Sequence, residues 1–161
     1  MESRAKLFGH PIHQMLIVFP LGLLATSIFF DLIALAADIP GLSQASYYMI
    51  AAGILTALVA AVFGLVDFLA IPNGTRAKRI GMMHGGGNLV VVVLFAASWL
   101  LRRGHPADPG TLAVVLSAAG TALGCLTGWL GGELVDRLGV GVDDGANLDA
   151  PSSLTHERIR H

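Results

Sequence analysis

The stretch GHPIHQMLIVFPLGLLATSIFFDLIALAA, residues 9–37, decides the fold of this chain. It opens on two histidines and continues as a long apolar run in which Asp31 is the one charged side chain. A membrane core of about 30 Å is crossed by a helix of about 20 mostly apolar residues. The run is too long for the apolar segment of a signal peptide, which has about 7–15 residues. We therefore predict a retained transmembrane helix over residues 11–37.

Three further apolar runs predict transmembrane helices at about residues 45–71, 83–102 and 111–136. The composition agrees, because 54% of the 161 residues are hydrophobic and 13% are charged, whereas soluble domains carry about 25% charged residues. We predict an all-α integral membrane protein, a four-transmembrane-helix antiparallel bundle formed by residues 1–142 within the lipid bilayer. Residues 143–161 are polar and predict a disordered tail.

The Lys and Arg residues of the short loops predict the orientation of the bundle. Arg4 and Lys6 precede the first helix, and residues 76–79 between the second and third helices hold three more cations. The opposite side offers only Arg102 and Arg103. Both termini are therefore expected in the cytoplasm.

Polar residues gather at the cytoplasmic end of the predicted helices. His13 opens the first helix, Asp67 closes the second and His84 opens the third, and His10 lies one helical turn before His13. Ionisable side chains near hydrocarbon are costly and are therefore paired, bound to a ligand or functional. We expect this cluster to be a ligand or metal site.

Two kinds of ligand fit these residue types. Imidazole and carboxylate groups suit Fe, Zn or Cu, with His10, His13, His84 and Asp67 as metal ligands. Helical bundles also hold haem through axial histidines, and here His13 and His84 form the natural pair for a haem b, with His10 as a third cofactor-binding residue. Supporting contacts around the ligands are expected from Asn88 and Glu133.

Two alternatives remain open. The histidines and Asp67 can fasten helices to one another without any ligand, as in a structural or accessory subunit. Ion or proton transport is the second alternative, although few polar residues lie near the middle of the predicted helices.

The fourth predicted helix carries a small residue at every fourth position, Gly120, Gly124, Gly128 and Gly132. Such a row lets helix backbones approach closely. We expect it to pack within the bundle, and a homodimer through this helix is the alternative. Asp31 lies about 27 Å along the helix from His13, and we expect it to form a structural salt bridge with Arg102 or Arg103 at the other surface.

Several functional classes find no support in the sequence. The net charge of −1 and the lack of a basic groove argue against a nucleic acid partner. No nucleophile–base motif, phosphate loop or dinucleotide fingerprint is present, so we expect a protein that is not an enzyme on its own.

Several short motifs resemble the "domain of unknown function 2231" family of predicted bacterial membrane proteins. The resemblance covers residues 7–142 and rests on Gly9-His10-Pro11-Ile12-His13, Gly64-Leu65-Val66-Asp67, Ile71-Pro72, Arg76, His84 with Asn88, and residues 128–135, GWLGGELV. It implies a small four-helix membrane protein of the bacterial cytoplasmic (inner) membrane.

The resemblance also carries a hint about chemistry. Some members of the family are joined to a Rieske-type iron–sulfur domain, which implies a redox association and a separate redox protein as partner for this chain. The chain departs from the family pattern in two places. Gln14 follows His13 where relatives often have proline, and Asp136 and Leu138 stand where many relatives carry Tyr and His.

Overall fold

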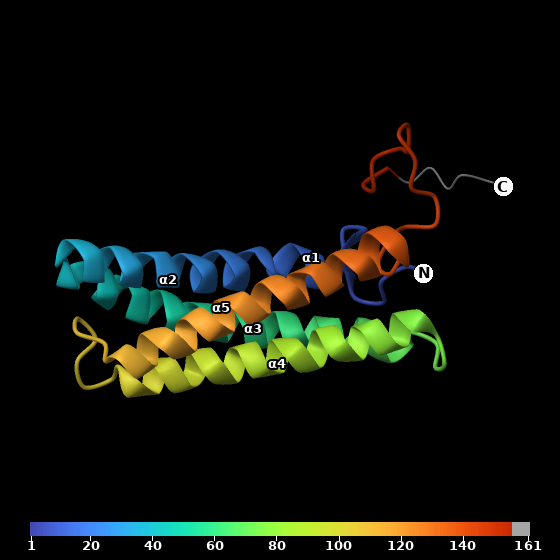
Figure 1. Ribbon diagram of the computed structural model, residues 1–161. Helices are drawn as coiled ribbons and strands as arrows, with labels where there is room; N and C mark the ends of the chain where they lie inside the picture. The colour runs from blue at the N-terminus through green and yellow to red at the C-terminus, as the bar shows by residue number, and fades with distance from the viewer. Residues whose placement is uncertain (156–161) are drawn as a thin grey trace.

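The computed structural model describes residues 1–155 and confirms a helical bundle with four long helices (Figure 1). The first long helix is nearly continuous from α1 to α2, and the fourth ends in a π-helical turn, η1. The element bounds are α1 (Ile12–Leu16), α2 (Val18–Ala37), α3 (Pro40–Ala70), α4 (Arg76–Leu101), α5 (Thr111–Gly132) and η1 (Glu133–Arg137). Each of the four is long and apolar enough to cross a membrane. The predicted fold class is therefore confirmed.

The α1–α2 junction lies one turn before a proline. Pro20 has no backbone N–H, so it cannot donate to the carbonyl of Leu16, where α1 ends. Ile17 bridges the break, because its N–H donates to the His13 carbonyl and its own carbonyl accepts from Leu21. His13 therefore keeps a helical position at the start of the first span.

Two helices begin earlier than the hydropathy of the sequence predicted. The second begins at Pro40 rather than near residue 45, because proline suits a first helical turn. The third begins at Arg76 rather than at residue 83, and Thr75 caps it by accepting a hydrogen bond from the Lys78 N–H at 3.1 Å. Polar residues outside the apolar core can continue a helix, and hydropathy alone misses such turns.

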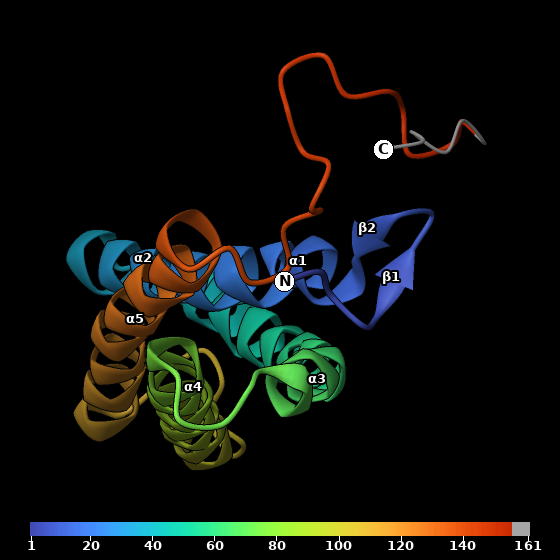
Figure 2. The same ribbon diagram turned by 90° about the vertical axis from the view of Figure 1, so that its right-hand side faces the viewer.

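The helices form two closely packed hairpins, α2 with α3 and α4 with α5. Seen along the bundle, the four long helices surround a common axis (Figure 2). Leu24, Ile50, Val91 and Phe95 form the buried core between them. Most other large apolar side chains point outward, which suits a bundle surrounded by lipid.

The N-terminal segment folds back over one end of the bundle. Two short strands, β1 (Lys6–Leu7) and β2 (His10–Pro11), pair antiparallel before α1. The Met1 ammonium donates to the Gly139 carbonyl at 3.0 Å. Residues 143–155 form no helix or strand, and residues 156–161 lie outside the described part of the chain. The chain start, the α3–α4 loop and the C-terminal segment thus share one end, called here the histidine end (Figure 1).

Candidate functional site

Two histidines from different hairpins meet at the histidine end. His13 lies on α1 and His84 on α4, and both side chains are half-buried. Their ring centroids are 6.4 Å apart, and the ring planes stand at 88° to each other. The sequence placed these two residues at the same end, and the structure brings them side by side.

Backbone carbonyls of neighbouring helices fix the orientation of both rings. His13 Nδ1 lies 2.9 Å from the Ala60 oxygen on α3, and His84 Nδ1 lies 2.8 Å from the Thr127 oxygen on α5. A carbonyl oxygen only accepts hydrogen bonds, so each Nδ1 carries the proton and donates it. In the neutral ring, Nε2 then keeps its lone pair.

Glycines create the room for these rings. A Cβ atom at Gly64 would lie 2.8 Å from His13 Nδ1, and one at Gly131 would lie 3.1 Å from His84 Cε1. Each ring therefore packs directly on the backbone of the neighbouring helix. Neither glycine belongs to the row that the sequence analysis singled out.

Asn88 and Thr127 hold His84 from a second side. The Thr127 hydroxyl donates to Asn88 Oδ1 at 2.9 Å, and Asn88 Nδ2 lies 3.2 Å from His84 Nε2 and 3.5 Å from Nδ1. A group that donates to the Nε2 lone pair lies in the plane of the ring, on the side of Nε2 that points away from Nδ1. Its distance to Nδ1 would then be much longer than the observed 3.5 Å. The amide therefore lies over the ring face and not in line with the Nε2 lone pair.

His10 and Asp67 have other partners. His10 is exposed on β2, and its Nε2 lies 3.3 Å from the Ser153 hydroxyl of the C-terminal segment. Both oxygens of the Asp67 carboxylate accept the Ser3 hydroxyl at 2.8 Å, and one also accepts the Arg4 N–H at 2.7 Å. Asp67 thus anchors the N-terminal segment. Among the described residues, no group of three or more His, Cys, Asp or Glu side chains could hold a metal ion.

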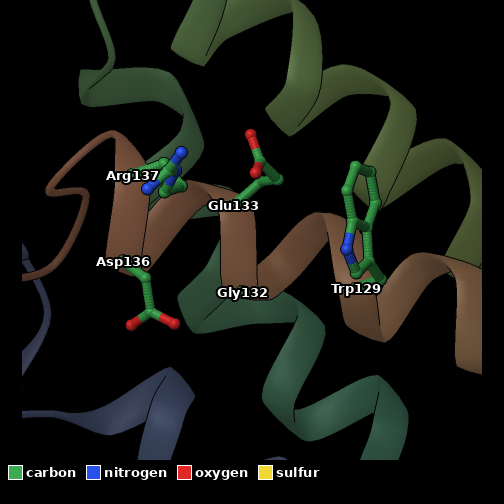
Figure 3. Close-up of a pocket in the computed structure, with 5 residues that line it drawn as sticks. All are labelled: Trp129, Gly132, Glu133, Asp136 and Arg137. Carbon is green, nitrogen blue, oxygen red and sulfur yellow. The ribbon is translucent and has the colours of Figure 1, made fainter.

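Glu133 binds a cation rather than a histidine. Its carboxylate lies 2.6 Å from the Arg76 guanidinium at the start of α4. Figure 3 shows Glu133 and Asp136 pointing apart from each other in a shallow pocket that also includes Trp129, Gly132 and Arg137. This ion pair ties η1 to α4 at the histidine end.

The opposite end of the bundle holds the buried salt bridge that the sequence predicted for Asp31. Its carboxylate binds the Arg102 guanidinium in a two-point contact of 2.8 and 2.7 Å. Both side chains are fully buried, so the prediction was right about the partner and wrong about a surface position. Burial is possible because Ser46, Ser98 and Ser117 accept the remaining guanidinium N–H groups.

The glycine row on α5 faces two ways. A Cβ at Gly120 would lie 2.9 Å from the Phe95 ring, so this position packs inside the bundle as predicted. A Cβ at Gly124, Gly128 or Gly132 would meet no heavy atom within 4 Å. No neighbouring helix among the described residues therefore packs on these three positions.

Comparison with known proteins gives a family and no function. No curated protein and no solved structure matches the chain. The family model described as "Predicted membrane protein (DUF2231)" matches residues 9–144, which include all four long helices and both histidines. The chain therefore belongs to the DUF2231 family of predicted membrane proteins.

Proposed function

We propose that this protein binds a redox-active metal cofactor, with haem b as the first candidate, between His13 and His84. One observation carries the proposal. Two imidazoles from different hairpins lie with ring centroids 6.4 Å apart, and each donates its Nδ1 proton to a backbone carbonyl. Histidines that bind metals almost always donate their other ring N–H in this way, which fixes the ring and its lone pair.

The number of available ligands favours haem over a closed metal site. A structural zinc site uses four protein ligands, whereas His10 and Asp67 are engaged elsewhere and leave two histidines. Haem iron needs only axial ligands from the protein. Two metal–nitrogen bonds of about 2 Å, added to two ring radii, place the axial ring centroids on the order of 6 Å apart, close to the observed spacing.

A role as a structural or accessory subunit is the second candidate. Each histidine hydrogen bond joins two helices, α1 to α3 and α4 to α5. The outward glycines of α5 would let another helix, from a second copy or another subunit, approach closely. Transport is the weakest candidate, because the apolar core of Leu24, Ile50, Val91 and Phe95 lies between the two polar ends.

The proposed setting is the bacterial cytoplasmic membrane, with the histidine end in the cytoplasm. Arg4, Arg76 and Arg79 lie at this end, and positively charged segments usually stay in the cytoplasm. A separate redox protein would then exchange electrons with the site from that side.

The test is an absorption spectrum of the full-length protein, purified gently in detergent, oxidised and then reduced with dithionite, with elemental analysis of the same sample. We expect a Soret band that shifts on reduction and near-stoichiometric iron. The variants His13→Ala and His84→Ala should lose both signals, whereas His105→Ala, an exposed histidine at the opposite end, should keep them. A colourless, metal-free wild type with a native-like melting curve would instead support the structural role.

A further inference from the structure

The two hairpins of the bundle correspond residue by residue. Their first helices match at an interval of 71 positions, which relates His13 to His84. Their second helices match at an interval of 67 positions, which relates Ala60 to Thr127. The contacts repeat with the positions, because Ala60 and Thr127 each give a carbonyl to the histidine of their own hairpin.

The same interval relates two glycines near the histidine end of α3 and α5. A Cβ at Gly64 would meet the His13 ring, and a Cβ at the equivalent Gly131 would meet the equivalent His84 ring. Each glycine thus leaves room for the imidazole of its own hairpin. Both hairpins begin at the histidine end, so equivalent residues lie at the same depth of the membrane.

One face of the second helix breaks this correspondence. On α5 and η1 the face consists of the residues that line the shallow pocket in Figure 3, Trp129, Gly132, Glu133, Asp136 and Arg137. The equivalent positions of α3 hold apolar residues, Val62, Leu65, Val66, Leu69 and Ala70. One hairpin therefore carries a tryptophan, a glycine and three charged side chains where the other hairpin is wholly apolar.

The apolar counterpart indicates what surrounds this face. Val62, Leu65 and Leu69 are each more than half exposed on α3. Large apolar side chains that point away from a membrane bundle are in contact with lipid. The two-fold relation gives the equivalent face of α5 the same surroundings, and Trp129 is exposed there, as tryptophans are in the aromatic belts at membrane surfaces. The pocket therefore opens sideways, toward lipid.

The backbone of the two hairpins differs at the same place. α3 remains α-helical to its end at Ala70, whereas α5 continues into the π-helical turn η1. In this turn the Leu138 N–H donates to the Glu133 carbonyl at 3.1 Å. Single π-helical turns are frequent at functional sites. Here the turn carries Asp136 and Arg137, the two charged residues at the end of the pocket.

The charges around the pocket balance, but two of them lack a partner. Glu133 binds Arg76, so these two charges cancel. Asp136 and Arg137 are exposed, and neither forms an ion pair with a side chain of residues 1–155. The pocket therefore offers one free carboxylate and one free guanidinium with no net charge. Such a pair suits a ligand that carries one negative and one positive group.

We propose that this pocket binds the headgroup of a zwitterionic phospholipid with a primary amine, of the phosphatidylethanolamine type. Arg137 donates to the phosphate, because a guanidinium matches phosphate oxygens in two-point contacts. Asp136 accepts hydrogen bonds from the ammonium group. A Cβ at Gly132 would meet no heavy atom within 4 Å, so this position leaves room for the headgroup.

The size of the pocket agrees with a headgroup. Its volume of about 240 Å³ is below the roughly 300 Å³ at which pockets that enclose a whole small molecule begin. The acyl chains therefore stay outside the pocket, in the bilayer. The headgroup site is separate from the proposed cofactor site, which uses neither Asp136 nor Arg137.

Two other lipid classes fit the pocket less well. An anionic headgroup such as phosphatidylglycerol brings no cation to the free Asp136 carboxylate. A choline headgroup has no N–H to donate to that carboxylate, and proteins recognise it with cages of aromatic rings. Trp129 is the one aromatic ring among the described residues that line this pocket.

The test is native mass spectrometry of the full-length protein in detergent, titrated with phosphatidylethanolamine, phosphatidylcholine or phosphatidylglycerol of identical acyl chains. We expect one phosphatidylethanolamine per chain to bind at least about threefold more tightly than either other lipid. Arg137→Gln and Asp136→Asn should each weaken this binding by about three- to tenfold, because each removes the charge that one half of the headgroup needs. Asp136→Asn should also remove the preference over phosphatidylglycerol.

Two glycine variants form a matched pair. Gly132→Leu adds a side chain whose Cβ meets no other atom of the described residues, so it fills the pocket and should weaken binding about as much as Arg137→Gln. Gly22→Leu adds the same side chain at another open glycine, on α2, and should leave the affinity for the lipid unchanged. Melting curves like that of the wild type show that the variants are folded.

Three results would overturn the proposed lipid site. The first is equal affinity for the three lipids, and the second is wild-type affinity in both Arg137→Gln and Asp136→Asn. The third is a different occupant, which would appear as a protein dimer that excludes lipid or as displacement of the lipid by soluble phosphoethanolamine at the same concentration. None of these results bears on metal or haem binding, so the proposed cofactor function is tested separately.

Discussion

The Asp31–Arg102 ion pair at one end of the bundle and the histidine pair at the other differ in how many of their hydrogen-bonding groups have partners. At the Asp31–Arg102 end, five hydrogen bonds use all the guanidinium donors, and four helices contribute partners. At the histidine end, both rings are half-buried, and His13 Nε2 has no hydrogen-bond partner within residues 1–155. A polar group in a membrane protein needs a partner. The saturated ion pair therefore serves the fold, and the unpaired His13 nitrogen agrees with the ligand site that we propose.

The largest expected effect comes from breaking the Asp31–Arg102 ion pair. Arg102→Leu leaves the Asp31 carboxylate buried without a counter-ion, which typically costs about 3–5 kcal/mol in the free energy of unfolding. Unfolding of the detergent-solubilised protein by a titrated denaturing detergent measures the loss.

Two variants control this prediction. Arg103→Leu removes an exposed guanidinium that lies 5.6 Å from the Trp99 ring, and we expect it to cost far less. The double variant Asp31→Leu/Arg102→Leu removes both charges and should recover much of the lost stability. Equal losses in Arg102→Leu and Arg103→Leu would show that the buried pair does not hold the bundle together.

Between the two ends, the core offers a matched pair of glycines on one helix. Gly120→Ala places a methyl group 2.9 Å from the Phe95 ring and should cost about 1–3 kcal/mol through overpacking. Gly124→Ala enters open space and should be neutral or stabilising by up to about 1 kcal/mol, because alanine favours helix. Thermal melts of the two variants compare them directly, and similar melting temperatures would contradict the assigned rotation of α5.

The sequence predicted the parts of this structure that follow from hydropathy and helical periodicity. Four apolar runs gave four helices, and the depth of His13, His84 and Asp31 along those runs placed each at the correct end. Periodicity says less about rotation around a helix axis. The sequence therefore could not decide between packing inside the bundle and a homodimer for each glycine of the row, and only Gly120 contacts a neighbouring helix.

Other features depend on contacts that have no periodic signal. Asp67 binds a segment that lies more than sixty residues earlier, and nothing in the N-terminal residues announces that fold-back. The two hairpins also correspond at constant intervals, 71 positions for their first helices, as in His13 and His84, and 67 positions for their second helices, as in Ala60 and Thr127. The sequence alone did not reveal this correspondence, because Asp31 and Arg102 carry opposite charges. They can be recognised as equivalent positions only when the structure shows them in contact.

A smaller effect tests whether the histidine end contributes to stability. His13→Ala and His84→Ala each remove one hydrogen bond between helices, worth about 0.5–1.5 kcal/mol. We expect both ligand-free variants to lose much less stability than Arg102→Leu in the same unfolding experiment. Losses as large as that of Arg102→Leu would make the histidines structural fasteners and remove the contrast between the two ends.

The smallest effect concerns the polar segments that cover the histidine end outside the membrane. A hydrogen bond to Glu2 raises the pKa of Lys6 above its usual 10.5, and the Gly145 N–H, with Lys6 itself, lowers the pKa of Asp143 below its usual 3.8. The lysine with its raised pKa stabilises the contact until the pH rises past that pKa. The carboxyl group with its lowered pKa stabilises the contact until the pH falls past that pKa. The Lys6–Asp143 contact, 3.5 Å long, should therefore hold over the whole range between the two usual values, 3.8 and 10.5, and open only at pH values beyond that range. Fluorescence transfer between labels at Phe8→Cys and Asp149→Cys, in a Cys125→Ser background, would follow the opening, and Asp143→Asn should abolish the acid transition. A signal that stays constant well below pH 3.8 and well above pH 10.5 would mean that contacts other than this ion pair hold the tail.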